Sequence, residues 1–427
     1  MIRTPPPRPP HSPPPRRLTV PRPPPVKRGQ LRLTKPLRER ILAGHPWVYD
    51  RAVGPTPPGT DAGGVVTVVD DQGELALAYA EPESPIRARI LAPPGTALDA
   101  AWSRARAEAA AARRSRDPLL AGCTGRRLIH GEADACPGLV VDVYDTTAVV
   151  VFDGPAAQAF WRPRLADVLA GLERGGARLE HAWLRGERRR TATGGAGSAG
   201  EALRGDPPAE LVIGEDEARF VVDVRNGQKT GFFLDQRDNR RAIRRHAAGQ
   251  TVLNVFCYTG GFSIHAALGG AARVTSVDIA PPAIAGVERN LALSGLAPAE
   301  HASMAESVAI DAFEFFARAA RQGRRWDLVI VDPPSFAPSE RARPAALAAY
   351  RKLAAAALAV TEPTGRFALA SCSSHVTEAD LLELIAGLSA EHGPLRLRMA
   401  AGAASDHPVL PAFPEGRYLK FLMFDLG

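Results

Sequence analysis

The stretch TVLNVFCYTGGFSIHAALGGAARVTSVD, residues 251–278, decides the fold that the sequence predicts. Residues 252–256 are a short apolar run of buried-strand type, and a glycine-containing break separates them from helix-forming residues at 262–268. A second apolar run, 273–277, ends on Asp278. A buried strand, a glycine turn, a helix and a second strand form half of a cofactor-binding site in an α/β sheet.

The glycine turn and Asp278 indicate which ligand such a site binds. Asp278 follows Gly260 by 18 residues, near the spacing at which an acidic side chain accepts hydrogen bonds from ribose hydroxyls. The pattern is not GxGxxG, so it favours an adenosine with a small charged tail over a dinucleotide, because a helix N-terminus can hold a carboxylate. S-adenosylmethionine is such a ligand. The alternative is a parallel-sheet turn that binds nothing.

The length and composition of the chain bound its class. A chain of 427 residues suggests about three domains, and an apolar content of 45% is enough for packed cores. No stretch approaches the roughly 18 uninterrupted apolar residues of a membrane span, and no apolar segment follows the N-terminus as in a secretory signal. We therefore expect a soluble, cytoplasmic protein with no membrane partner.

The positive charge of the chain is concentrated at its N-terminus. The formal charge is +7, and residues 1–30 contain seven Lys and Arg residues and no acid, so the rest of the chain balances to zero. The same segment holds 12 of the 39 prolines, which forbid a continuous helix. We expect a disordered Pro/Arg-rich arm at 1–30, which either attracts RNA phosphates without sequence preference or has no partner.

Two smaller domains are expected before the strand and helix pattern begins. Residues 31–95 predict a small β-rich domain, with a helix at 37–43, a hairpin of 65–69 and 74–80, and a strand at 86–91. Its Trp47 is interpreted as a core residue rather than a base-stacking platform. Residues 96–210 predict a mixed α+β middle domain, with helices at 100–114 and 160–172, two strands joined at 145–147, and a flexible Gly-, Ala- and Ser-rich loop at 191–208.

Residues 211–427 predict an α/β domain. Strands and helices alternate there, which implies a mostly parallel sheet covered on both faces. The expected strands are 252–256, 273–277, 327–331 and 366–371, followed by 395–399 and 418–424 as an antiparallel edge. The expected helices are 262–268, 281–293, 311–320, 342–360 and 377–389.

Chemically useful side chains follow the ends of these strands. In an open α/β sheet the ligand lies beyond the carboxyl ends of the strands, so these side chains should share one rim. Asp332 presents acceptors to a base edge, and Pro333 and Pro334 make a rigid lip on which a flat base can rest. A stiff loop without function is the alternative.

Cys372 is the candidate nucleophile. It lies between serines at a strand end, whereas Cys123, Cys136 and Cys257 are interpreted as structural, and no CxxC pair predicts a metal site or a disulfide framework. Carbon 5 of a pyrimidine is a poor nucleophile, but addition of a thiolate to carbon 6 makes an enamine that can attack a sulfonium methyl group. A base then removes the proton from carbon 5, and the thiolate leaves.

Several long motifs resemble one family, the bacterial large-subunit ribosomal RNA cytosine-5 methyltransferases with an N-terminal PUA domain. The motifs are HPWVYDRAV, SPIRARIL, LIHGEADACPGLVVDVYD, GQKTGFFLDQRDNR, VLNVFCYTGGFS, DAFEFF, DLVIVDPPSFAPS, SCSSHV and DHPVLPAFPEGRYLK. The resemblance covers almost everything after the arm. It implies an RNA-binding PUA domain at 31–95, a middle domain at 96–210 and a Rossmann-like class I methyltransferase domain at 211–427.

The same resemblance implies residue roles and partners. S-adenosylmethionine would be held by the side chains and turn of Phe256, Tyr258, Gly260, Asp278 and Asp311, with Gln236 and Arg240 lining the pocket. Asp278 would take the ribose and Asp311 the adenine amino group. Asp332 would orient the target base and Cys372 would be the sole nucleophile. The partner would be large-subunit ribosomal RNA, and a homodimer is compatible with the family.

Two other functions stay open on the sequence. Related domains that methylate guanine N7 or exocyclic nitrogens also carry Asp-Pro-Pro, but a nitrogen lone pair needs no covalent nucleophile, so Cys372 discriminates between the two chemistries. The second alternative is an RNA-binding or ribosome-assembly factor with a vestigial catalytic fold. The presence of Gly260, Asp278, Asp332 and Cys372 together argues against decay.

Overall fold

The structure is a computed structural model that describes residues 29–186, 200–296 and 305–427. The predicted arm at 1–30 lies outside the described residues except for Gly29 and Gln30, which begin the first strand. In the described part of the chain no helix combines the length and the apolar character that crossing a membrane would require.

The N-terminal sheet contains five strands in the order β1-β3-β4-β5-β2. The strands are β1 (Gly29–Arg32), β2 (Trp47–Tyr49), β3 (Val65–Asp70), β4 (Gly73–Ala80) and β5 (Ile86–Ala92), and the helix α1 is Arg38–Leu42. The hairpin, the following strand and the single helix expected from the sequence are confirmed. Buried aliphatic side chains such as Val66, Val68 and Ala78 fill the core of this sheet.

A second five-stranded sheet has the order β10-β9-β8-β7-β6. Its strands are β6 (Gly125–His130), β7 (Leu139–Tyr144), β8 (Thr147–Phe152), β9 (His181–Leu184) and β10 (Glu201–Arg204), and its helices are α2 (Ala100–Ser115), α3 (Pro155–Trp161) and α4 (Leu165–Arg174). The helix expected at 160–172 is two helices, because the segment between them, Arg162–Arg164, contains Pro163 and forms a 3-10 turn.

The loop expected at 191–208 is partly wrong. Residues 191–199 lie outside the described residues, but Glu201–Arg204 form β10, which pairs antiparallel with β9. Ion pairs hold this strand, because Glu201 contacts Arg162 at 2.7 Å and Arg204 contacts Glu173. Because ion pairs rather than apolar contacts hold β10, its sequence lacks the alternation of apolar and polar residues that predicts a strand.

The largest sheet contains seven strands in the order β15-β14-β13-β16-β17-β19-β18. The strands are β13 (Thr251–Val255), β14 (Arg273–Asp278), β15 (Ala305–Ala309), β16 (Trp326–Val331), β17 (Thr361–Ser371), β18 (Leu395–Ala401) and β19 (Lys420–Leu426). A two-stranded hairpin of β11 (Glu210–Glu215) and β12 (Ala218–Asp223) precedes it. The first five strands are parallel, and β19 and β18 form the expected antiparallel edge.

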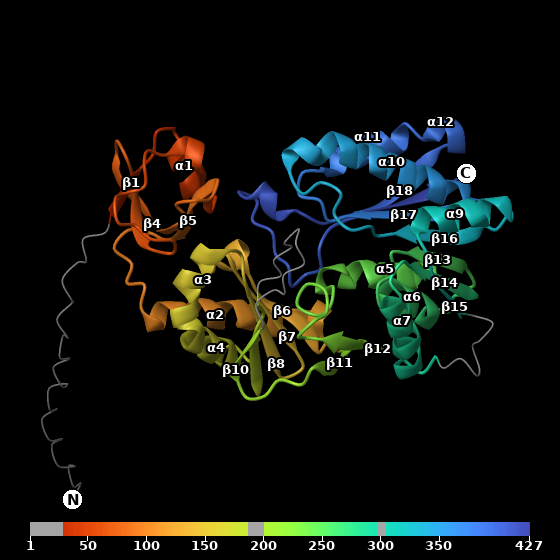
Figure 1. Cartoon of the computed structure of the whole chain (residues 1–427), viewed down its shortest axis with the longest axis horizontal. Helices are drawn as coiled ribbons and strands as arrows, with labels where there is room; N and C mark the ends of the chain where they lie inside the picture. The colour runs from red at the N-terminus through yellow and green to blue at the C-terminus, as the bar shows by residue number, and fades with distance from the viewer. Residues whose placement is uncertain (1–28, 187–199, 297–304) are drawn as a thin grey trace, which may run out of the picture.

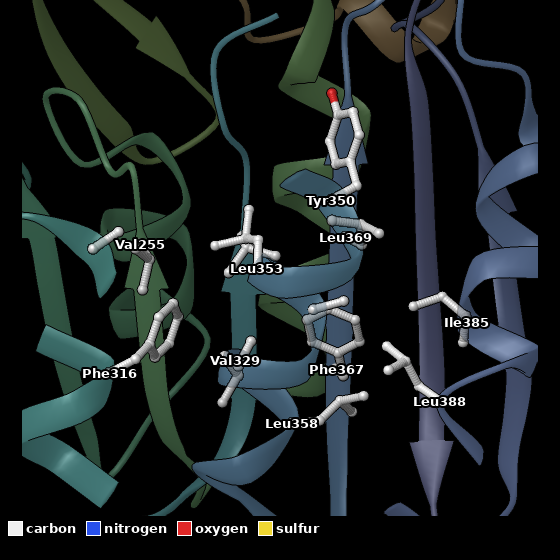
Figure 2. Close-up of a cluster of buried hydrophobic side chains, with 14 of the residues drawn as sticks. Val255, Phe316, Val329, Tyr350, Leu353, Leu358, Phe367, Leu369, Ile385 and Leu388 are labelled. Atoms are coloured by element: carbon white, nitrogen blue, oxygen red, sulfur yellow. The ribbon is translucent and has the colours of Figure 1, made fainter. Parts of the chain in front are cut away.

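Helices cover both faces of this sheet, as Figure 1 shows, with α9, α10 and α11 on one side and α5, α6 and α7 on the other. Their bounds are α5 (Arg237–His246), α6 (Gly261–Leu268), α7 (Pro281–Leu293), α9 (Ala312–Arg321), α10 (Arg343–Ala359), α11 (Glu378–Ala386) and α12 (Ser389–His392). Figure 2 shows Val329, Leu353 and Phe367 within the core between the sheet and α10.

The strand order places a ligand site at one point on the sheet rim. The strands β14 and β15 are added in order on one side of β13, and the next strands, β16 and β17, are added on its other side. The carboxyl ends of β13 and β16 therefore flank a crevice between helices that leave in opposite directions. The Rossmann-like α/β fold with a preceding β-rich domain is the fold class that the sequence predicts.

Four features of this domain differ from the sequence predictions. The strands β11 and β15 and the helix α5 were not predicted, and the single helix expected at 377–389 is divided into α11 and α12 around Gly387.

Candidate active site

A cavity of about 450 Å³ opens at the carboxyl ends of β13, β14, β16 and β17. Nine of the residues singled out from the sequence line it: Gln236, Arg240, Phe256, Tyr258, Asp278, Asp332, Pro333, Pro334 and Cys372. The cavity size is within the range of small-molecule sites, about 300–1,000 Å³. The side chains expected at the strand ends thus line one open cavity.

The turn after β13 has an unusual backbone. Phe256 and Tyr258 both have left-handed conformations, with φ of 62° and 49°. Such conformations in large residues are strained and occur where the surrounding structure holds the backbone for a function. Gly260 follows with φ of +83°, and a Cβ there would lie 2.7 Å from Cδ1 of Ile264, so only glycine fits. This turn brings backbone N–H groups and the Tyr258 side chain to the cavity.

The carboxylate of Asp278 is fixed at the end of β14. Its Oδ2 accepts the backbone N–H of Tyr258 at 2.9 Å, and its Oδ1 accepts that of Ala280 at 3.0 Å. Each carboxylate oxygen can accept further hydrogen bonds, so both oxygens keep acceptor capacity toward the cavity. A pair of vicinal hydroxyls can donate to these two oxygens.

The sequence reasoning missed an apolar side chain next to Asp278. Ile279 lines the cavity and is 70% exposed, although it is a large hydrophobic residue. An exposed aliphatic side chain beside a hydroxyl-binding carboxylate offers a surface for a flat apolar ring such as a purine. The signal was present in the sequence, because Ile279 directly follows the acidic residue at the strand end.

Asp235 and Lys229 were also missed. The buried Asp235 carboxylate lines the cavity and accepts hydrogen bonds through Oδ2 from Lys229 and from the Tyr418 hydroxyl, the latter at 2.6 Å. Its Oδ1 is buried with no hydrogen-bond partner among the described residues. An acceptor in that state fits a ligand that brings a cationic or N–H donor group.

Asp332 follows β16 and is held by Gln236. The Gln236 amide donates to Asp332 Oδ2 at 3.0 Å, and its own Oε1 accepts a hydrogen bond from Asn239 at 2.7 Å. Burial, with the negative charge of Asp235, raises the pKa of Asp332 to about 7. The carboxyl group is therefore poised between donor and acceptor forms near neutral pH, which suits a group that contacts a base edge.

Cys372 directly follows β17, the neighbour of β16 in the sheet. Its side chain is half-buried, and it lines the cavity together with Asp332. Burial and the Asp332 carboxylate raise the pKa of the Cys372 thiol, while the ammonium of Lys229 opposes that shift. The other three cysteines are buried.

Arg240 reaches the cavity from α5 but is already paired. It is buried, its Nε donates to Glu215 Oε2 at 2.8 Å, and its Nη1 donates to the Phe233 carbonyl at 2.8 Å. A Cβ on Gly261 would lie 2.9 Å from Cδ of Arg240, so the helix α6 and this arginine pack directly together. Arg240 forms the floor of the cavity and anchors the turn.

Gly260 and Asp311 are not among the side chains that line the cavity. Gly260 acts through its backbone, as the N-cap of α6. Asp311 is exposed and is the N-cap of α9, where its Oδ1 accepts the N–H groups of Phe313 and Glu314 at 2.9 and 3.2 Å. The N–H of Ile310 donates to the Asp278 carbonyl at 3.0 Å, which places Asp311 beside the end of β14.

These groups fit S-adenosylmethionine. The Asp278 carboxylate can accept hydrogen bonds from the ribose hydroxyls, and the Ile279 side chain can pack against the purine. The unpartnered oxygen of Asp235 can accept a hydrogen bond from a positively charged amino group. Bound there, the cofactor would supply an activated methyl group on a sulfonium.

Comparisons with known proteins agree with this geometry. The family model of S-adenosylmethionine-dependent methyltransferases matches residues 126–384, and that of a PUA-like domain matches residues 31–93. A ribosomal RNA large subunit methyltransferase from Deinococcus radiodurans is 39% identical over 93% of this chain and 98% of its own length. A ribosomal RNA large subunit methyltransferase I from Shewanella denitrificans is 34% identical over 91% of this chain and 97% of its own length.

The fold has a solved counterpart. A structure described as a SAM-dependent methyltransferase from Streptococcus mutans superposes with a TM-score of 0.78 at 22% identity, covering 93% of this chain and all of that chain. Three observations together assign the family of the chain. They are the cavity, the family match over more than half of the chain, and the relatives that are similar along nearly its whole length. The chain belongs to the family of S-adenosylmethionine-dependent methyltransferases that includes these relatives, and carries an N-terminal PUA-like domain.

Proposed function

We propose that the protein methylates carbon 5 of a cytidine in large-subunit ribosomal RNA through a covalent adduct with Cys372. The RNA class is supported by the names of the two relatives, both ribosomal RNA large subunit methyltransferases. The cytosine-5 chemistry rests on one observation, that Cys372 lines the same cavity as Asp278 and Asp332. A ribosomal RNA substrate also makes the cytoplasm the proposed location.

The proposed contacts to the cofactor follow the cavity lining. Asp278 accepts the ribose hydroxyls, and Asp235 accepts the amino group of the methionine portion. Asp311 accepts the adenine amino group through the oxygen that does not cap α9. The turn of Phe256, Tyr258 and Gly260 supplies the backbone surface, while Gln236 and Arg240 line the pocket.

The proposed reaction uses Cys372 and Asp332 on one pyrimidine. The Cys372 sulfur bonds to carbon 6, and the electron pair of the 5,6 double bond moves so that carbon 5 becomes nucleophilic. Carbon 5 takes the methyl group, and the sulfonium becomes a neutral thioether. A base removes the proton from carbon 5, the double bond re-forms, and the sulfur leaves carbon 6. The base lies on the rigid surface of Pro333 and Pro334, and Asp332 binds its edge.

Two competing functions make different predictions for the same residues. Methylation at a guanine or another nitrogen uses a lone pair and has no role for a sulfur at this position, so Cys372 favours carbon. A ribosome-assembly factor without activity has no need of a cavity in which Asp235, Asp278 and Asp332 all offer acceptors. The possibility of a homodimer stays a prediction from the sequence.

Nucleoside analysis tests the proposed product. Unmodified large-subunit ribosomal RNA is incubated with the full chain and isotopically labelled S-adenosylmethionine, then digested to nucleosides. The proposal expects the label in 5-methylcytidine, and its loss with Cys372→Ala. Label in a methylated guanine or in an N4-methylated cytidine would exclude the cytosine-5 assignment.

A further inference from the structure

A second cavity, of about 410 Å³, lies against the first and belongs to all three parts of the chain. Trp47 of β2, Glu132 and Phe152 of the middle sheet region, and Phe413 and Glu415 of the segment before β19 contribute to its wall. We propose that this cavity binds the nucleobase next to the target nucleotide. The proposal rests on the proposed RNA substrate, and it does not depend on which atom of the target is methylated.

The two cavities share a wall. Cys372 lines the first cavity and Ser374 lines the second. Residues two apart in an extended chain are at most about 7 Å apart, which is the order of the step between neighbouring nucleotides in an unstacked strand. Tyr418 lines the second cavity, and its hydroxyl donates at 2.6 Å to Asp235, which lines the first. A strand with one base in the first cavity therefore passes the mouth of the second.

The lining favours a base rather than a phosphate. Glu132, Asp153 and Glu415 place carboxylates around the cavity, and burial holds the pKa of its His130 well below the ordinary value, so that ring is neutral. Arg89 pairs with Glu132 and Asp153 at 2.6 and 2.8 Å, so Glu415 is the lining acid with acceptor capacity left, and the lining residues include no Lys or Arg to hold a phosphate. The edge of a base with amino or ring N–H groups would instead donate to Glu415, as carboxylates accept from base amino groups.

One acceptor in this cavity is available for such a donor. Glu415 Oε1 accepts hydrogen bonds from the Tyr49 hydroxyl at 3.2 Å, whereas Glu415 Oε2 is buried with no partner among the described residues. A buried acceptor without a partner is uncommon, because its lost hydration is not compensated. The N–H edge of a base that enters the cavity would satisfy it.

Aromatic and aliphatic side chains supply the remaining surface. Trp47 is half-buried, its ring lies 4.6 Å from that of Phe413 in an edge arrangement, and Val409 is 40% exposed at the same cavity. Trp47, interpreted from the sequence as a core residue, thus faces an open space. RNA-binding proteins recognise splayed bases by stacking on such rings, and enzymes that extrude a base also contact its flanking nucleotides.

Two variants and a matched control test the site in the full chain. Val409→Trp fills the cavity from an exposed position, and Glu415→Gln keeps the shape but changes the acceptor. Val212→Trp is the control, because Val212 is 50% exposed on β11 and does not line either cavity. The probe is unmodified large-subunit ribosomal RNA, and the readouts are its KM, its Kd with S-adenosylhomocysteine present, and total methyl transfer.

The proposal expects both cavity variants to raise KM and Kd for the RNA about tenfold, with kcat and the cofactor Kd unchanged, because a stacked base contributes about 1–3 kcal/mol. The control should behave as the unmodified chain. RNA affinity equal to that of the control in both cavity variants would overturn the subsite. If the unmodified protein binds the RNA but transfers no methyl group, the proposed function is overturned instead. The Kd values of the variants would then still show whether the second cavity binds a base.

Discussion

The hydroxyl of Ser335 lies 3.0 Å from the hydroxyl of Ser373, and this contact ties together the loops after two neighbouring strands. Ser335 ends the Asp332-Pro333-Pro334-Ser335 segment after β16, and Ser373 follows Cys372 after β17. The Tyr350 hydroxyl, from α10, donates to Ser371 at 2.8 Å and lies 3.3 Å from Ser373. The segments that carry the proposed nucleophile and the proposed base-orienting carboxylate are thus linked by one network of hydroxyl groups.

Loss of this contact should slow the methyl transfer. Ser373→Ala removes the Oγ that meets Ser335 and that also accepts the Ala337 N–H at 3.3 Å. A displacement of about 1 Å between reacting groups can lower a rate about 100-fold. We expect kcat to fall at least tenfold while the Kd for S-adenosylmethionine, measured by calorimetry, is unchanged. Equal losses in cofactor binding would show that Ser373 supports the whole cavity.

The Asp278 carboxylate should dominate cofactor affinity. Hydrogen bonds to a charged group contribute about 1.5–3 kcal/mol, so Asp278→Ala should weaken S-adenosylmethionine binding at least about tenfold. Asp71→Ala is the control, because Asp71 is fully exposed on the N-terminal sheet. Calorimetric titration gives both values. Similar affinity in the two variants would remove Asp278 from the ribose site.

The raised pKa of Asp332 predicts a pH-dependent gain of stability in Asp332→Asn. In the folded chain burial raises this pKa from 3.8 to about 7, so the folded state holds the proton more tightly than the unfolded state. The contribution of Asp332 to stability therefore falls as pH rises from about 4 to above 7. The variant should gain at most about 3 kcal/mol relative to the native chain between pH 5 and pH 8.

Thermal unfolding of the ligand-free chain at the two pH values measures this gain. The same variant should lose methyl transfer at both. An advantage of equal size at pH 5 and pH 8 would mean that Asp332 is ionised throughout, which would contradict its raised pKa.

The Glu215 carboxylate should be the main electrostatic support under the cavity floor. Burial alone would raise its pKa, but the guanidiniums of Arg240 and Arg237 outweigh burial and hold the pKa well below the ordinary value. Glu215→Gln leaves the buried Arg240 without a carboxylate partner, whereas Arg237 keeps Asp406, and the loss of that buried pair costs about 3–5 kcal/mol of stability. Glu210→Gln is the matched control, since its pair with Arg289 is about half exposed and contributes at most about 1 kcal/mol. Equal denaturation midpoints in the two variants would contradict this account.

The sequence predicts the parallel part of the fold because its strands are apolar on both faces. Runs such as 327–331 and 366–371 are buried between two helix layers, so they stand out as apolar blocks between helices. The helix α5 could not be recognised in the same way. Its inward face carries Arg237 and Arg240, which are buried because acids from distant segments, Asp406 and Glu215, neutralise them.

The strand β15 was missed for a related reason. Its residues, Ala305–Ala309, are half-buried or exposed at the sheet edge, and Glu306 is paired with Arg324. A short edge strand that contains a charged residue has no continuous apolar run by which the sequence could reveal it.

The site was predicted to the extent that its residues follow strand ends in the chain. Asp278, Asp332 and Cys372 are found that way, because parallel strands put their carboxyl ends on one rim. Lys229 and Asp235 come from a segment outside the sheet, and only the tertiary structure brings their charges to the cavity. Asp311 caps α9, a role that an Asp at the start of a predicted helix favours, and its expected contact with the adenine stays a prediction.

The central claim, that the Cys372 sulfur and the methyl donor act on the same pyrimidine, is tested most directly by trapping. Large-subunit ribosomal RNA containing 5-fluorocytidine has no proton on carbon 5 to remove, so the adduct cannot resolve after methylation. Incubation with S-adenosylmethionine should give a denaturation-resistant protein–RNA band, with the RNA attached to Cys372 in the peptide mass spectrum and no band for Cys372→Ala. Full methylation of unsubstituted RNA by Cys372→Ala would contradict the account.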